Sequence, residues 1–156
     1  MSFEIVHDTG NSEPIRIPEI GLELQVRLSK QASGGELTVI ETANAPGFGP
    51  PLHRHPETEI FRVTRGRYLF EVNGKRFHAT EGDVVCVPGG AAHGFVNVTD
   101  APATQIVMIL PGFDAANFFT GLADVLAGGR PNPAILAAFG TRWGVEFLGP
   151  PIQSEQ

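Results

Sequence analysis

A dense series of short apolar runs between residues 53 and 110 constrains the fold of this chain more than any other feature. The runs in this stretch lie at 59–63, 68–72, 75–79, 84–87, 93–98 and 104–110, and two more precede it at 22–29 and 37–42. Most end at a turn signal such as Asn73-Gly74, which favours a two-residue hairpin because both residues tolerate positive φ. About eight short strands without intervening helices predict an antiparallel sandwich or a closed barrel.

The C-terminal part of the chain has a different, helical pattern. Asp114 is expected to cap a helix that runs through about Leu126, and Asn132-Pro133 is expected to open a second helix that Gly140 can end. Both helices carry apolar residues that need burial, so we expect them to cover the barrel mouth or to pack on a second subunit. These residues are Phe118, Phe119, Leu122, Leu126, Ile135, Leu136 and Phe139.

Composition restricts the class of protein and its partners. A chain of 156 residues with 42% hydrophobic residues and no internal repeat predicts one domain over 1–156. The net charge of −6 and the scattered basic residues argue against nucleic acid as a partner. The N-terminus lacks a signal-peptide pattern and no apolar run is long enough to span a membrane, so we expect a cytoplasmic protein without membrane contact. Cys86 lies in an apolar run and is expected in the core.

Two histidines and a glutamate at even spacing predict a metal site. His53 and His55 project from the same face of an extended segment, and Glu59 adds a carboxylate at another even offset, at the start of an apolar strand. A carboxylate there needs a cation or hydrogen bonds. His93 is distant in sequence, so spacing alone favours a structural histidine, whereas the fold could bring it to the same ion. The intervening Glu57 is expected to be exposed.

The spacing of ten residues resembles the two sequence motifs of the cupin superfamily. Gly47, His53, His55, Glu59 and Gly66 match the first motif at every position. The second motif is matched equally well, by Gly82, Pro88, Gly90, His93 and Asn97. The resemblance covers about residues 36–112, and within the superfamily the chain is similar to the small bacterial quercetin-dioxygenase-like cupins.

This resemblance implies an all-β jelly-roll barrel, or double-stranded β-helix, followed by two short helices in an extension over 113–147. It implies that His53, His55, Glu59 and His93 point into the barrel and bind one divalent transition metal ion, which could be Fe, Mn, Ni, Co, Cu or Zn. Asn97 would be a structural position. Homodimers are common among the proteins that this chain resembles, so a homodimer is expected.

A metal site with open positions in an apolar barrel favours a dioxygenase-type enzyme that acts on a small enol, phenolic or flavonol-like substrate. Glu59 is the candidate catalytic residue, as acceptor of a substrate proton. Phe61, which shares the inward face of Glu59, and Met108, in an apolar strand, are the candidate pocket residues. A metal-dependent isomerase or decarboxylase, and a cupin that binds a small ligand without catalysis, are the alternatives.

Overall fold

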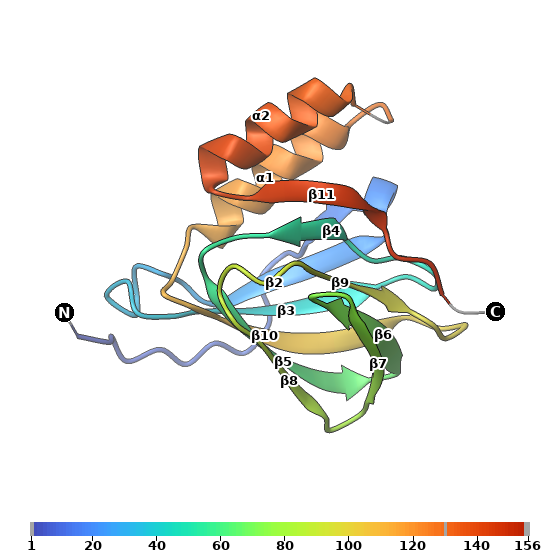
Figure 1. Ribbon diagram of the computed structural model, residues 1–156. Helices are drawn as coiled ribbons and strands as arrows, with labels where there is room; N and C mark the ends of the chain where they lie inside the picture. Colours follow the sequence, from blue (N-terminus) through green and yellow to red (C-terminus); the bar gives the residue numbers. More distant parts are fainter. Residues whose placement is uncertain (1, 130, 155–156) are drawn as a thin grey trace.

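The computed structural model describes residues 2–129 and 131–154, which form two facing antiparallel sheets and a pair of helices (Figure 1). The six-stranded sheet has the order β1 (Ile15–Ile17), β2 (Leu22–Leu28), β3 (Thr38–Asn44), β10 (Ala103–Leu110), β5 (Thr58–Arg65) and β8 (Val84–Val87). The five-stranded sheet has the order β11 (Glu146–Pro151), β4 (Pro51–Arg54), β9 (His93–Asn97), β6 (Arg67–Val72) and β7 (Lys75–Thr80). A 3-10 turn, η1 (Pro18–Ile20), separates β1 from β2. The jelly-roll expectation is therefore confirmed.

Strand register arranges the space between the sheets in three layers. Glu59 lies beside Ile109 and forms the first layer with His93 of the opposite sheet. The second layer is mainly apolar and contains three aromatic rings at 5.3–5.5 Å from one another, those of Phe61, Phe70 and Phe95. The third layer is polar and fully or almost fully buried, and it consists of Thr42, Asn44, Tyr68, Asn97 and Gln105. The interior thus has a titratable end and a neutral polar end.

Asn97 joins segments of the chain in the third layer. Its Nδ2 donates hydrogen bonds to the carbonyl oxygens of Asn44, at 2.9 Å, and Ala101, at 2.8 Å. Its Oδ1 accepts from the backbone nitrogen and the hydroxyl of Thr99, at 2.8 and 2.7 Å. Its backbone pairs with Gly47 and Phe48 in the loop before β4. The structural role that the cupin resemblance implied for Asn97 is therefore confirmed.

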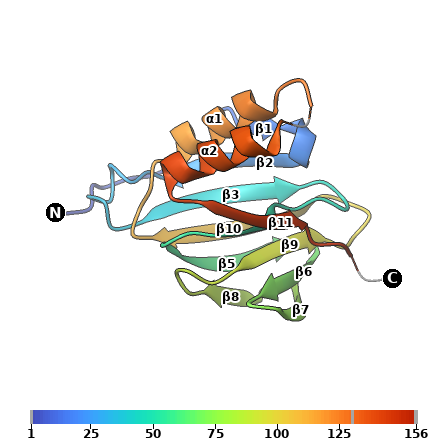
Figure 2. The ribbon, with the colours of Figure 1, turned by 45° about the horizontal axis from the view of Figure 1, so that its top comes forward.

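The C-terminal helices α1 (Ala115–Leu126) and α2 (Pro133–Trp143) lie together at one side of the sheets, with α1 beside β1 and α2 beside β11 (Figures 1 and 2). The expected caps are present, because the side chains of Asp114 and Asn132 accept backbone hydrogen bonds from Asn117 and Ala134. The expected end at Gly140 is wrong. Gly140 lies inside α2, and the helix ends at Gly144, which has a φ of 73°.

The buried faces of the helices meet β1 in a second core. Phe118, Leu122, Leu126 and Phe139 are buried there with Ile17. Ile135, expected to be buried, is instead 57% exposed because it lies on the outer side of α2. In the part of the chain that the structure describes, no helix is long and apolar enough to cross a membrane.

The sequence patterns do not predict β1 and β11, whereas β4 corresponds to the extended segment expected at His53, with His55 just after its end. β11 carries Gly149, Pro150 and Pro151 and pairs only with β4, an edge position at which proline is tolerated. The prediction for Cys86 is also wrong. Its strand alternates, so that Val85 and Val87 face the core, and Cys86 is exposed on the outer face.

Candidate metal centre

The fold brings His53, His55, Glu59 and His93 together between the two sheets. His53 lies in β4, His55 directly after it, Glu59 in β5 and His93 at the start of β9. One potential ligand atom of each residue lies within 4.8 Å of the others. The sequence predicted all four, including His93, which is placed by its pairing opposite His53 in the sheet.

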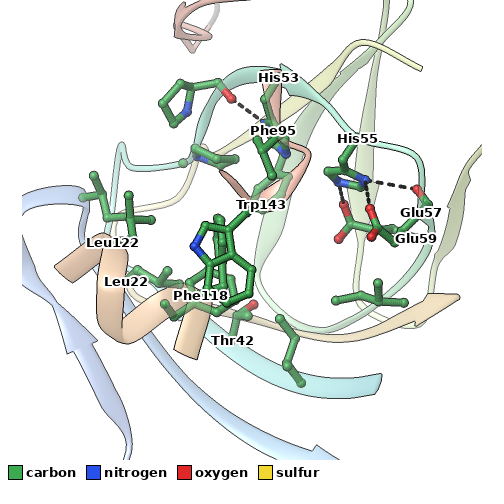
Figure 3. A pocket seen from close by; sticks show the side chains of 18 of the residues that line it. Leu22, Thr42, His53, His55, Glu57, Glu59, Phe95, Phe118, Leu122 and Trp143 are labelled. Carbon is green, nitrogen blue, oxygen red and sulfur yellow. Dashed lines mark hydrogen bonds and ion pairs between the residues drawn. The ribbon is translucent and has the colours of Figure 1, made fainter. Parts of the chain in front are cut away.

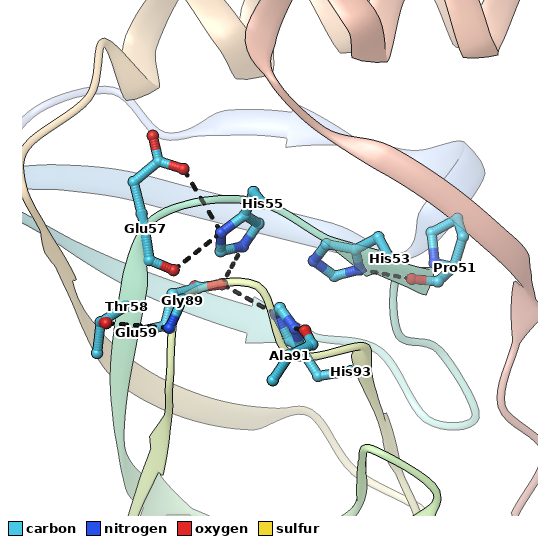
Figure 4. Close-up of polar contacts among 9 residues, drawn as sticks. All are labelled: Pro51, His53, His55, Glu57, Thr58, Glu59, Gly89, Ala91 and His93. Carbon is cyan, nitrogen blue, oxygen red and sulfur yellow. Dashed lines mark hydrogen bonds and ion pairs between the residues drawn. The ribbon is translucent and has the colours of Figure 1, made fainter.

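Each histidine is oriented by a backbone carbonyl two residues away. The Nδ1 atoms of His53, His55 and His93 lie 2.6, 3.1 and 2.8 Å from the carbonyl oxygens of Pro51, Glu57 and Ala91 (Figure 4). When Nδ1 donates to a carbonyl, a neutral imidazole carries its lone pair on Nε2. This is the arrangement by which metal-binding histidines are usually held, with the second nitrogen facing the ion.

Glu59 lies between two of the imidazoles. Its Oε1 is 2.6 Å from Nε2 of His55 and 3.1 Å from Nε2 of His93, and the residue is only 9% exposed. Burial alone would raise the pKa of this carboxyl group, but the hydrogen bonds and positive charge of His55 and His93 outweigh burial and lower it. Glu59 is therefore an ionised carboxylate in an otherwise dry environment.

The same contacts shift the pKa values of His53 and His55, the two histidines of the first motif, in opposite directions. Burial lowers the pKa of His53 to about 4, assisted by repulsion from His93, so His53 is neutral at neutral pH. Burial also acts to lower the pKa of His55, but its hydrogen bond to Glu59 and the Glu59 charge outweigh burial and raise it. Nε2 of His55 and Oε1 of Glu59 thus face each other at 2.6 Å, where a cation could bind to both atoms.

The four side chains fit a divalent transition metal ion. Three imidazole nitrogens and one carboxylate oxygen are donors that Fe, Mn, Ni, Co, Cu and Zn accept. The carboxylate is buried, and the imidazole rings are close, with centroids 4.3–5.5 Å apart. A buried carboxylate surrounded by imidazoles that are already oriented is therefore a fitting donor set for such an ion.

A cavity of about 140 Å³ adjoins this cluster (Figure 3). Its wall is mostly apolar and comes from both sheets, from the loop before β4 and from the C-terminal helices. Phe118, Phe119, Leu122 and Trp143 contribute from α1 and α2. The helices therefore line the mouth of the barrel, which is one of the two arrangements expected from their apolar faces.

The two predicted pocket residues differ in position. Phe61 lines the cavity and is 1% exposed. Met108 is absent from the lining, because alternation in β10 turns Val107 and Ile109 inward and directs Met108 to the opposite face. Ile109, its neighbour, lines the cavity instead.

Other lining residues were not foreseen. Glu57, expected to be exposed, is partly buried and lines the cavity, with its carboxylate 3.5 Å from Nδ1 of His55. Thr42 and Asn44 add polar groups from β3, and Trp143 and Phe147 come from the C-terminal segment. Strand alternation could have placed Thr42 inward, but no local signal connects the C-terminal segment with the cavity.

The charge of the cavity wall is one-sided. The acidic residues Glu57 and Glu59 line it, and no lysine or arginine does so among the residues that the structure describes. Phosphate and carboxylate groups are usually bound by arginine or lysine. The side chains of the wall therefore provide no lysine or arginine to bind an anionic group, and their surface is largely apolar.

Comparison with known proteins finds a family match over part of the chain. Residues 41–109 match the family described as the cupin domain, and the similar solved structures include further cupins. Over this stretch the chain is therefore similar to the cupin domain, in agreement with its two sequence motifs. No curated protein matches the sequence.

Three solved structures illustrate the similarity. A protein from Thermotoga maritima described as a predicted oxalate decarboxylase is 25% identical, with 69% of this chain and 99% of that chain covered and a TM-score of 0.63. An RmlC-like cupin from Shewanella frigidimarina is 22% identical, over 73% and 94% of the chains, with a TM-score of 0.61. A cupin from Silicibacter pomeroyi described as a sugar phosphate isomerase is 26% identical, over 65% and 67%, with a TM-score of 0.52.

Proposed function

We propose that this protein binds one divalent transition metal ion through His53, His55, Glu59 and His93. We further propose that it catalyses a dioxygenase-type reaction on a small, neutral enol, phenolic or flavonol-like substrate. The observation that carries this proposal is the opening of a histidine and glutamate cluster into an apolar cavity that no described lysine or arginine lines. The metal, when bound, would supply a Lewis acid that polarises a coordinated substrate oxygen.

The chain's own residues would bind the substrate, exclude water and move a proton. Apolar side chains such as Phe61, Phe95 and Trp143 form a wall against which an unsaturated or aromatic substrate can pack. Helices α1 and α2 restrict access of bulk water to this space. Glu59 is the proposed catalytic residue, because its carboxylate lines the same cavity and, on leaving the metal, could accept a proton from a substrate hydroxyl.

An oxygen-independent reaction is the second candidate. Two of the similar structures are described as a predicted oxalate decarboxylase and a sugar phosphate isomerase. The corresponding substrates are anionic, whereas the wall here carries carboxylates and no lysine or arginine within residues 2–129 and 131–154. A decarboxylase or isomerase of neutral substrates stays an alternative, as does a cupin that binds a ligand without turnover.

Metal binding is tested first, by elemental analysis of protein purified without chelators and by titration with Zn and Co. Wild type should bind one ion per chain, and His55→Ala should lose it. His78→Ala is the matched control, because His78 is exposed on β7, and this variant should bind as wild type does. Binding that survives His55→Ala would reject the proposed ligand set.

The reaction is tested with protein reconstituted separately with Fe, Mn, Ni, Co or Cu under anaerobic conditions. Oxygen uptake in the presence of flavonols or catechols, lost in Glu59→Ala, would support a dioxygenase. Product formation without oxygen would favour the isomerase or decarboxylase. If no metal and substrate combination gave turnover while ligands still bound, the non-catalytic alternative would replace the enzyme.

Homodimerisation and a cytoplasmic location stay predictions. Light scattering of the purified protein tests homodimerisation.

A further inference from the structure

The cavity has a second polar region, on β3, away from the histidine cluster. Thr42 and Asn44 both line the cavity and are 7% and 2% exposed. Figure 3 shows Thr42 on the wall below Phe118 and Trp143, on the opposite side of the view from His55 and Glu59. Nothing in the proposed metal chemistry uses these two residues.

Thr42 has an unsatisfied hydroxyl group. Its Oγ1 is buried and has no hydrogen-bond partner among the described residues. A buried polar group without a partner costs free energy, so native proteins rarely keep one without a reason. A rotation about χ1 moves the hydroxyl of threonine to another staggered position, from which it could reach a molecule in the cavity.

Asn44 is held in an orientation that complements Thr42. The Tyr68 hydroxyl donates to Oδ1 of Asn44 at 2.9 Å, and burial raises the pKa of Tyr68, which keeps this hydroxyl protonated. Because Oδ1 faces Tyr68, the Nδ2 donors of the same amide face away from it. The backbone oxygen of Asn44 is fixed by Asn97, so the amide belongs to a rigid part of the fold.

Strand register gives the separation between the two polar regions. Ile109 lies opposite both Glu59 and Thr38, so these two residues are at one level of the six-stranded sheet. Thr42 follows Thr38 by four residues on β3, which corresponds to about 13 Å at roughly 3.3 Å per residue. Ile40 lies between them and lines the cavity with apolar atoms. The two regions are therefore at opposite ends of an apolar wall.

We propose that Thr42 and Asn44 form a second anchor, which binds an uncharged oxygen at the end of the ligand remote from the histidine cluster. This inference rests on the proposed function and narrows its substrate class. The ligand is a mostly apolar molecule that carries metal-binding oxygens at one end and a hydroxyl or carbonyl group at the other. Two-ring phenolic compounds of the flavonol type have this pattern.

A purely structural role for Thr42 is the competing explanation. Gln105 lies directly opposite Thr42 in the sheet, and both of its side-chain amide atoms are buried without a partner. A small rotation could join the two side chains and make Thr42 a stabilising residue. The two explanations predict opposite effects of Thr42→Val, which removes the hydroxyl and keeps the shape. An anchor for ligand is dispensable for stability, whereas a structural partner of Gln105 is not.

The test compares 3-hydroxyflavone with its 4′-hydroxy derivative, which differ by one hydroxyl at the remote end. Binding is followed by the fluorescence of Trp143, the single tryptophan of the sequence, which lines the cavity. Titrations use zinc-loaded wild type, Thr42→Val, Thr42→Ser and the control Thr64→Val, whose hydroxyl lies on an exposed part of β5. Zinc avoids oxidation of the probe, and thermal melting of each variant is measured alongside.

Wild type and Thr64→Val should bind the 4′-hydroxy compound about fivefold more tightly, as expected for one net hydrogen bond. Thr42→Val should lose this preference with an unchanged or higher Tm, and Thr42→Ser should retain it. Equal binding of both compounds to wild type, no quenching by either, or a lower Tm of Thr42→Val with an unchanged preference would each overturn the proposal. The preference is measured also on metal-free protein, so a failure of metal binding is distinguishable from a failure of the anchor.

Discussion

Replacement of Asn97 by alanine should destabilise the protein far more than an average substitution. The side chain is fully buried and makes four hydrogen bonds, two as donor to Asn44 and Ala101 and two as acceptor from Thr99. Alanine would remove all four and deprive the Asn44 carbonyl of this donor, whereas the Ala101 carbonyl would keep its hydrogen bond from the Thr99 hydroxyl. It would also leave a small cavity in the polar layer between the sheets.

The size of the effect follows from these contacts. Net contributions of about 1 kcal/mol per hydrogen bond sum to about 4 kcal/mol for Asn97→Ala. For a chain of this length, each kcal/mol lowers the Tm by roughly 2–4 °C, so the expected decrease is about 8–16 °C. Urea denaturation followed by circular dichroism measures the free energy of unfolding directly, and the denaturant slope shows whether unfolding stays two-state.

Asn117→Ala is the matched control for Asn97→Ala. Asn117 is exposed in α1 and bonds to Asp114, so its loss should change the free energy of unfolding by less than about 0.5 kcal/mol. If Asn97→Ala stayed within 1 kcal/mol of wild type, the hydrogen bonds of Asn97 would not be a main link between the strands and the loop before β4.

Three further predictions test other parts of the structure. Zinc at about 100 times its Kd should stabilise wild type by about 2.7 kcal/mol, a Tm increase of about 5–11 °C, and should leave His55→Ala unchanged in scanning fluorimetry. Gly49→Ala should lower the free energy of unfolding by more than about 3 kcal/mol or abolish soluble expression, because its Cβ would lie 1.7 Å from the carbonyl oxygen of Phe95. Gly149→Ala is the control, because a Cβ there would meet no atom within 4 Å, and it should leave the free energy of unfolding in urea unchanged. The pKa of His53 is lowered to about 4 from an unfolded value near 6.5, so its contribution to stability is present above pH 6.5 and is lost as the pH falls to 4. In metal-free protein, His53→Gln should therefore lose less stability than wild type between pH 6.5 and pH 4. If the Tm of both proteins fell equally over this interval, the lowered pKa of His53 would be contradicted.

Much of the fold could be predicted because its main strands leave local patterns. The alternation of Leu22, Leu24, Val26 and Leu28 and the Asn73-Gly74 turn both correspond to elements of the structure. The caps Asp114 and Asn132 located the start of each helix. Helix ends depend more on tertiary packing. Gly140 has a local signal for termination, yet α2 continues through it. The glycine instead allows close packing, since a Cβ there would lie 2.4 Å from the carbonyl oxygen of Val145.

The candidate metal centre was predictable and its cavity was not. Fixed spacing in two motifs encodes the histidines and Glu59, because each motif is a local stretch of chain. The cavity wall combines β3, β5 and the C-terminal helices, which are joined only by tertiary structure. Met108 shows the difficulty, since an apolar strand with no polar alternation gives no sign of which face is inside.

The pairing of β11 with β4 has a consequence for biosynthesis. β4 carries His53, and Phe147 of β11 lies directly opposite this histidine in the sheet. During translation, the ribosome therefore releases the residues of both motifs well before it releases the strand that completes their sheet. A nascent chain that ends before residue 146 would expose an unpaired edge beside His53. The order of synthesis thus means that the centre acquires its final surroundings only after β11 has left the ribosome.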